Sequence, residues 1–250
     1  MDKKYRKMIA TEFRNCVNNT IRRLQVEATY RPFHSALLSE EALFWSRFER
    51  SFSTSFGQRV IEEIARIVAL SNGASIAQRQ KDTFIKLDNA YVIAISTHIQ
   101  ELRNGKKSNW STTIRTLRSI PMSGTTTTLR IISDLWWQKN GINNYISLKT
   151  VKPNIDQTAV AKEDCLYLSL ADPYCNAYFG LPYNPYGENK EDYAHNPPMG
   201  IFDFHHDPVV LIGKEMWDTI GGSGCYEELI DIAQEVGRET KQTIAPIFNR

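Results

Sequence analysis

Asp134 and Lys149 are the two residues of this chain whose types and spacing best suit hydrolytic chemistry. Asp134 lies in the stretch 125–137, which is rich in β-branched and aromatic residues and therefore predicts a strand. Lys149 follows a second strand-like stretch, and the pair Asn140-Gly141 between the two is a turn signal. The pattern thus predicts a hairpin that brings Asp134 beside Lys149.

The residues just before Lys149 would complete a site for a divalent cation and a phosphodiester. In an extended strand the side chains of Ser147 and Lys149 share one face, and that of Leu148 points into the core. The Asp134 carboxylate and the Leu148 backbone carbonyl are hard oxygen ligands for Mg²⁺, which can activate water. A neighbouring lysine can orient or deprotonate that water. By itself the pattern is weak, because Asp and Lys on neighbouring strands are more often edge residues.

Three segments carry a resemblance to a known family. Lys149-Thr-Val-Lys-Pro-Asn154 resembles the core of PD-(D/E)XK restriction endonucleases, in which Thr, Lys, Pro and Asn follow the strand lysine. The segments 177–187 and 221–229 resemble the downstream region of TdeIII-like type II restriction enzymes, and the resemblance covers about residues 30–248. It implies an α/β, restriction-endonuclease-like fold with a short mixed central sheet flanked by helices. It also implies Mg²⁺-dependent hydrolysis of double-stranded DNA at a short palindromic site, for which GGNCC is a candidate, leaving a 5′-phosphate.

The resemblance assigns roles to individual positions. Asp134 matches the first acidic metal ligand, Lys149 the catalytic lysine, and Glu63 a helix carboxylate near the metal. Position 147 departs from the pattern, because the family has Asp or Glu where this chain has Ser147, a poor and neutral ligand. Three explanations stay open. Another carboxylate, with Glu63 the best candidate, takes over the role; the chain is a natural or engineered variant with reduced cleavage; or the acid lies elsewhere.

Polar residues after the predicted catalytic strand are candidates for contact with DNA. Asn154 and Gln157 can bond to adenine with two hydrogen bonds each, and Asp156 can accept from cytosine. Lys152 would add a second cation near the DNA backbone. A palindromic target cut on both strands predicts a homodimer. A restriction role also predicts a cognate DNA methyltransferase as genomic neighbour.

The elements that must position these residues are predicted from apolar spacing. Helices are expected over 2–28, from Ser39 onward, over 55–70, over about 81–103 and over 226–240; strands are expected over 125–137, 145–151, 165–170 and 209–212, with a long loop over 172–208. In the helix over 55–70, Glu63 lies at the margin of the apolar stripe, whereas Glu62 lies opposite that stripe.

Composition and length indicate one endonuclease domain over 1–250. Its parts are a mainly helical region (1–104), the catalytic sheet with recognition loops (110–215) and C-terminal helices (216–250). No signal-type or membrane-spanning stretch is found, so a cytoplasmic protein without membrane contact is expected. The four cysteines form no CxxC pair, so reduced thiols are expected and a zinc site is not.

The net charge of +2 is unevenly distributed. Residues 1–25 carry a net +5, residues 101–153 a net +7, and residues 154–250 a net −10. We expect a basic surface from the first two segments that binds a polyanion, with the acidic segment facing away or forming a partner surface. Three alternatives remain: a same-fold DNA-binding protein that has lost cleavage through Ser147, a repair or RNA nuclease of the same superfamily, and a noncatalytic interaction domain.

Overall fold

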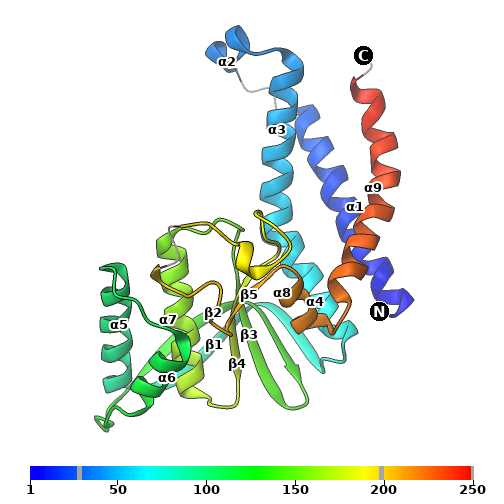
Figure 1. The fold of residues 1–250 in the computed structure, drawn as a ribbon. Coiled ribbons are helices and arrows are strands. Elements are labelled where there is room, and N and C mark those ends of the chain that lie inside the picture. The colour runs from blue at the N-terminus through cyan, green and yellow to red at the C-terminus, as the bar shows by residue number, and fades with distance from the viewer. Residues whose placement is uncertain (27–29, 197–199, 249–250) are drawn as a thin grey trace.

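A five-stranded mixed sheet forms the centre of the molecule, a computed structural model that describes residues 1–26, 30–196 and 200–248 (Figure 1). The strand order is β1-β2-β3-β4-β5. β1 and β3 are each antiparallel to β2, and β3, β4 and β5 are parallel. Their bounds are β1 (Ile76–Asp88), β2 (Thr126–Lys139), β3 (Ile142–Leu148), β4 (Asn176–Leu181) and β5 (Val210–Ile212). The α/β class expected from the sequence is confirmed.

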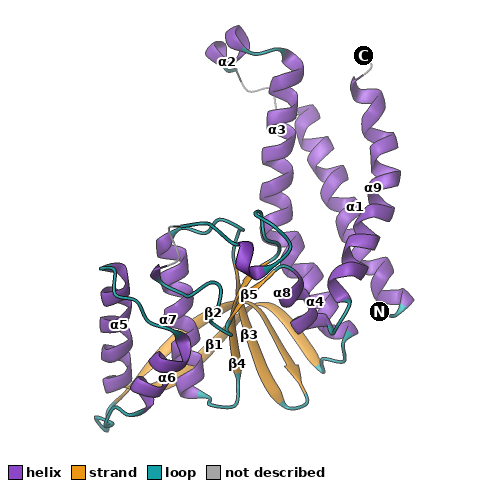
Figure 2. Ribbon diagram, in the orientation of Figure 1, coloured by secondary structure: helices purple, strands orange, loops and turns teal. Residues whose placement is uncertain are grey.

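Helices cover both faces of this sheet (Figure 2). On one face, α5 (Asn89–Arg103), α6 (Trp110–Arg118) and α7 (Ile155–Ala171) bury an apolar cluster with the sheet. On the other face, α4 (Ile61–Ser71) and α8 (Lys214–Gly221) build a second cluster. Strands β3, β4 and β5 are therefore largely buried on both sides, whereas most of β1 stays exposed or half-buried. Burial of the two faces fixes the strand register, because a slip of one residue would exchange them.

Three long helices project from the α4 side of the sheet and form what we call the arm (Figure 1). They are α1 (Lys3–Val26), α3 (Glu40–Ser55) and α9 (Cys225–Phe248), with the short α2 (Pro32–Leu37) at the tip. Ser39 caps the start of α3 by accepting a hydrogen bond from the Ala42 N–H, which agrees with the helix expected from Ser39 onward. A π-helical turn, η1 (Phe56–Val60), joins α3 to α4, so the helix expected over 55–70 is continuous.

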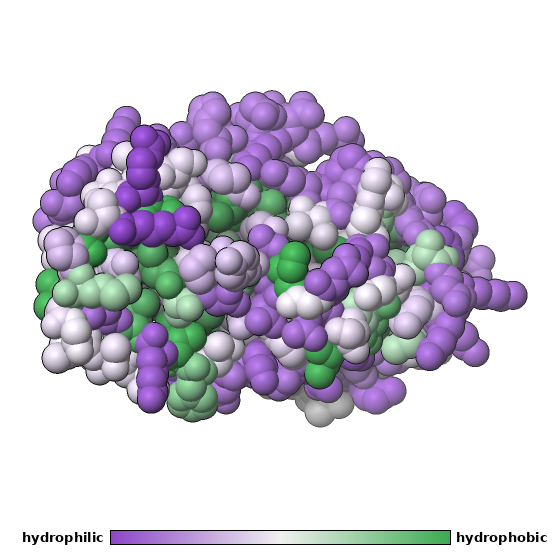
Figure 3. All heavy atoms as spheres, turned by 90° about the horizontal axis from the view of Figure 1, so that it is seen from below, coloured by the Kyte–Doolittle hydropathy of each residue, from purple (hydrophilic) through white to green (hydrophobic). Residues whose placement is uncertain are grey.

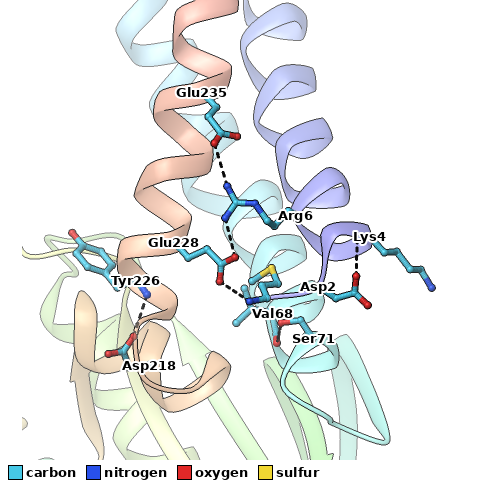
Figure 4. Close-up of polar contacts among 10 residues, drawn as sticks. Asp2, Lys4, Arg6, Val68, Ser71, Asp218, Tyr226, Glu228 and Glu235 are labelled. Carbon is cyan, nitrogen blue, oxygen red and sulfur yellow. Dashed lines mark hydrogen bonds and ion pairs between the residues drawn. The ribbon is translucent and has the colours of Figure 1, made fainter.

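Ion pairs hold α1 against α9 at the base of the arm (Figure 4). The terminal ammonium of Met1 lies 2.9 Å from Glu228, and Arg6 contacts both Glu228 at 2.9 Å and Glu235 at 3.2 Å. Farther along, Arg14 lies 2.7 Å from a carboxylate oxygen of α9. The expectation that the acidic C-terminal segment faces away from the basic N-terminal one is therefore wrong for α9, and the alternative of a partner surface stays a prediction. Opposite charges on the two helices pair with each other.

Three sequence predictions of secondary structure are wrong, and one of them is the loop expected over 172–208, which contains β4. The stretch predicted to be helical from residue 81 is strand β1 as far as Asp88, which then caps α5. Along β1, exposed residues alternate with half-buried ones, and many of both are polar. The sequence therefore lacks the alternation of apolar and polar residues by which a strand is usually recognised. The stretch 165–170, predicted as a strand, belongs to α7. Most of α7 is buried, and its nearly continuous apolar run resembles an interior strand.

Other elements match their predictions. β2 and β3 form the expected hairpin, with Asn140 and Gly141 at positive φ in the turn. Strand β5 and helix α9 lie where the pattern placed them, and α8 overlaps the C-terminal helical part expected over 216–250. The four cysteines are free thiols.

Among the described residues, no helix is long and apolar enough to cross a membrane. Figure 3 shows the face opposite the tip of the arm, where hydrophobic residues lie in separate patches between hydrophilic ones.

Candidate active site

The Asp134 carboxylate is the centre of the candidate site. Its Oδ2 accepts hydrogen bonds from the backbone N–H of Leu148 at 2.7 Å, from Lys149 Nζ at 3.0 Å and from the Ser147 hydroxyl at 3.3 Å. The paired residues of β2 and β3 end at Leu135 and Ile146, so the pairing stops one residue short of Asp134. Where the β2–β3 pairing ends, the Asp134 carboxylate accepts the hydrogen bond of the Leu148 N–H in place of a backbone carbonyl. Asp134 therefore lies beside residues 147–149, as the sequence predicted.

Lys149 is held in place by its own backbone. It is the first residue after β3, and its N–H donates to the carbonyl of Gly180 on β4 at 3.0 Å. The side chains of Lys149 and Asp134 are 24% and 17% exposed, so the pair is partly desolvated but still reachable from solvent. A cation in this position can interact with a phosphate and with Asp134.

Glu62 and Gln80 complete one side of this group. Gln80 Nε2 donates to Asp134 Oδ1 at 3.2 Å and to Glu62 Oε1 at 3.0 Å. Burial raises the pKa of Glu62, the charge of Asp134 raises it further, and the hydrogen bond from Gln80 opposes both. Glu62 therefore lies within the electrostatic reach of the Asp134–Lys149 pair.

The structure does not bring Glu63 to this group. Its carboxylate pairs with Arg66 at 2.6 Å and with Arg79 at 3.3 Å. The sequence interpretation placed Glu62 opposite the apolar stripe because it counted only large side chains. Ala65 and Ala69 are also buried and lie three and seven residues after Glu62, on its side of the helix. Because Ala65 and Ala69 are buried, the buried face of α4 is wider than the stripe of large side chains, and Glu62 lies at its edge. From there its carboxylate can reach the site.

A further carboxylate comes from α7. Burial raises the pKa of Asp164 to about 7, with Glu163 and Asp134 adding to the shift and Lys149 opposing it. Asp164 also lines a small cavity together with Ser147. Asp164 was not among the residues expected at the site, because the apolar pattern from residue 165 predicts a strand and not a helix. The useful signal was the acidic pair Glu163-Asp164 shortly after the lysine, on a segment that begins with the N-cap residue Asn154.

The four residues predicted to contact DNA all have contacts within the protein. Asn154 and Gln157 form a capping box at the start of α7, in which each side chain accepts the other residue's backbone N–H at 2.8 and 3.3 Å. Asp156 pairs with Arg103 at 2.5 Å. Lys152 Nζ lies 5.3 Å from the centre of the Tyr186 ring. Contact of these residues with DNA stays a prediction.

The donor set fits a divalent cation, although no three His, Cys, Asp or Glu side chains among the described residues form a metal-binding cluster. Burial is the main cause of the raised pKa values of Glu62 and Asp164, and the charge of Asp134 adds to both. A cation would offset the negative charge of these groups. In a strand, the N–H and C=O of one residue point to the same neighbouring strand, so the Leu148 carbonyl faces the side of Asp134. Carboxylate and carbonyl oxygens are the ligands that Mg²⁺ prefers.

Comparison with known proteins gives a consistent result. The sequence model described as "Type II restriction endonuclease, HinfI" matches residues 1–237. Type II restriction enzyme HgiEI of Herpetosiphon aurantiacus is 31% identical over 93% of this chain and 86% of its own length. HgiCII of the same organism is 30% identical over 88% of this chain and 82% of its own length. Type II restriction enzyme MjaII of Methanocaldococcus jannaschii is 26% identical over 88% of this chain and 66% of its own length. No solved structure matches.

Proposed function

The chain belongs to the HinfI family of type II restriction endonucleases, and from this we propose that it cuts double-stranded DNA at a short palindromic site with Mg²⁺ as cofactor. The products would carry a 5′-phosphate, and GGNCC is the sequence to test first. The observation that supports this most is the convergence of Lys149, Leu148 N–H and Ser147 on one carboxylate oxygen of Asp134.

Asp134, Glu62 and the Leu148 carbonyl would hold the cation. When bound, Mg²⁺ would polarise the scissile phosphate and lower the pKa of a water molecule. The Lys149 ammonium would stabilise negative charge on the phosphoryl oxygens and orient the attacking water. Ser147 would keep Asp134 in position through its hydroxyl, which donates to Oδ2 at 3.3 Å.

Ser147 stands where the family has a carboxylate ligand. We assign the role of that missing carboxylate to one of two acids on α7, Glu163 or Asp164. Of the two acids, Asp164 has the stronger support. It lines the same small cavity as Ser147 and interacts electrostatically with Lys149 and Asp134. The variants Asp164→Asn and Glu163→Gln separate the two acids. We expect Asp164→Asn to raise the Mg²⁺ concentration needed for half-maximal cleavage more than Glu163→Gln does. The opposite order would transfer the role to Glu163.

Cutting both strands of a palindrome calls for two copies of the site, so we propose a homodimer. The tip of the arm supports a second copy as partner, because Phe33 is 79% and Leu37 82% exposed. Exposed apolar clusters of this kind usually mark contact surfaces. Sedimentation of the wild type and of a Phe33→Asp/Leu37→Asp variant tests this assignment. A monomeric wild type, or a dimer unaffected by the substitutions, would contradict it.

The decisive experiment is digestion of a plasmid with the protein and Mg²⁺, followed by mapping of the fragment ends. Discrete fragments with 5′-phosphates are expected, and none in EDTA. DNA treated with the cognate methyltransferase expected near the gene should resist cutting. The site of action would be the cytoplasm, where both enzymes meet DNA.

The second candidate function is a DNA-binding protein that no longer cuts, and the observation that favours it is Ser147 in place of a carboxylate. Specific, salt-sensitive binding of the target without any cleavage in Mg²⁺ or Mn²⁺ would support it. A smear of products would instead point to a nuclease without site preference.

A further inference from the structure

We propose that Gln80 is a positioning residue that holds the carboxylates of Glu62 and Asp134 side by side as one cation-binding pair. This inference rests on the proposed function, because it assigns the pair to the cation that DNA cleavage would use. Gln80 lies on β1, whereas Glu62 belongs to α4 and Asp134 to β2. One side chain therefore connects three elements of the fold.

The contacts of Gln80 show how it acts. Its Nε2 carries two N–H groups and lies 3.0 Å from Glu62 Oε1 and 3.2 Å from Asp134 Oδ1. Two carboxylates this close to one atom repel each other unless a donor or a cation lies between them. A neutral amide offsets the repulsion without cancelling the negative charge. A lysine or arginine in its place would pair with the carboxylates and compete with a metal ion.

The backbone of Gln80 gives an independent observation. Among the described residues other than glycine, φ is positive at Gln80 (47°) and at Asn140 (53°). Asn140 lies in the Asn-Gly turn between β2 and β3, where positive φ is usual. Gln80 lies inside a strand, where an L-residue rarely adopts this conformation. Such outliers persist where the surroundings enforce them, and they concentrate at functional sites.

The position of this deviation matches the role. Arg79 pairs with Leu135 and Lys81 with Ser133, so Gln80 lies opposite Asp134. Pairing is regular on both sides, and the distortion is confined to the residue that faces the candidate metal ligand. The strand thus departs from regular geometry at the one point where a side chain must reach both Asp134 and the helix that carries Glu62.

The test is the affinity of the DNA-free protein for Mn²⁺, measured by titration calorimetry on wild type, Gln80→Ala and Gln78→Ala. Gln78 is the matched control, because it is the same residue type two positions earlier on β1 and pairs with Trp136, outside the site. We expect Gln80→Ala to weaken Mn²⁺ binding about 10-fold to 100-fold, the usual effect of losing a residue that orients metal ligands. Gln78→Ala should bind as the wild type does.

A second variant guards against loss of folding. Gln80→Gly accepts the positive φ without strain, so it should fold and still show the weakened Mn²⁺ binding. Wild-type affinity in both folded Gln80 variants would overturn the role of Gln80 while leaving the proposed function intact. A wild type that binds no Mn²⁺, or binds it equally well after Asp134→Ala, would overturn the proposed function and the Gln80 inference together.

Discussion

Lys149 Nζ lies 3.0 Å from Asp134 Oδ2, although the two residues are 15 positions apart in the chain. The hairpin of β2 and β3 brings them together, and the pairing of Lys149 N–H with Gly180 fixes the lysine at the end of β3. A basic side chain is thus held beside a carboxylate that is also a candidate metal ligand.

Loss of Lys149 should therefore reduce catalysis more than DNA binding. We expect Lys149→Ala to lower the single-turnover cleavage rate by about 10²-fold to 10⁴-fold, the usual contribution of a positioned proton-transfer group. The matched control is Lys139→Ala, which changes the last residue of β2, at the hairpin turn. This variant should cut normally. Equal rates in the two variants would remove Lys149 from the catalytic group.

Glu62 and Glu63 should respond differently to neutralisation. Glu62→Gln should weaken Mg²⁺ binding, because Glu62 shares Gln80 with Asp134. Glu63→Gln should leave Mg²⁺ affinity unchanged and lower the free energy of unfolding by about 0.2–1 kcal/mol, because it breaks partly exposed pairs with Arg66 and Arg79. Calorimetry and chemical denaturation of both variants measure these effects. If only the Glu63 variant bound the metal more weakly, Glu63 would be the helix carboxylate near the metal, as the sequence resemblance implied.

Ser147→Asp would supply the carboxylate that the family pattern has at this position. A second negative charge beside Asp134 should destabilise the metal-free protein and lower the Mg²⁺ concentration needed for half-maximal cleavage. Thermal melting with and without Mg²⁺ gives the first quantity, and a cleavage titration gives the second. An unchanged Mg²⁺ requirement would mean that position 147 does not face the cation.

The capping box of α7 makes a prediction about Asn154. Asn154→Ala should lower the free energy of unfolding by about 1 kcal/mol, because the side chain accepts the Gln157 N–H at 2.8 Å. Sequence preference in cleavage should stay the same. If stability were unchanged and cleavage at the target were lost, the contact with DNA bases predicted from the sequence would be favoured over the cap.

Asp88 should make the stability depend on pH in the acid range. Backbone N–H groups of Ser123, Ala90 and Gly124 and the Ser123 hydroxyl donate to its carboxylate and lower its pKa to about 2, with backbone Ser123 the largest cause. The unfolded chain has the ordinary value of 3.8 and binds the proton first as pH falls. The stabilisation is therefore complete above about pH 5 and is lost between about pH 4 and 2.

The comparison of wild type with Asp88→Asn measures this effect. The difference in their free energies of unfolding should be constant from pH 5 to 7 and should shrink as pH falls toward 2. A difference that does not depend on pH would show that the ionised carboxylate is not what stabilises this junction.

The sequence predicted the parts of the fold that have strong local patterns. The β2–β3 hairpin followed from β-branched residues and an Asn-Gly turn, and it was sufficient to bring Asp134 and Lys149 together. β1 was missed because its polar alternation carries little apolar contrast, and α7 because most of it is buried. These two errors hid Gln80 and Asp164, since neither could be placed beside Asp134 without the correct element.

The choice between Glu62 and Glu63 depended on tertiary burial of the small residues Ala65 and Ala69. A periodicity of large side chains does not report this burial. The pairing of α1 with α9 was equally inaccessible, because net charge per segment does not say which oppositely charged helices become neighbours.

We assign Asp134 and Lys149 as the catalytic centre of a site-specific endonuclease, and a cleavage assay with an Asp134 variant checks this assignment. Plasmid DNA is incubated with Mg²⁺ and either the wild type or Asp134→Asn, a variant of nearly the same shape, after both are shown to bind the DNA equally well. We expect discrete fragments with the wild type and at least about 10²-fold slower cutting with the variant. Equal cutting by the two proteins would contradict it.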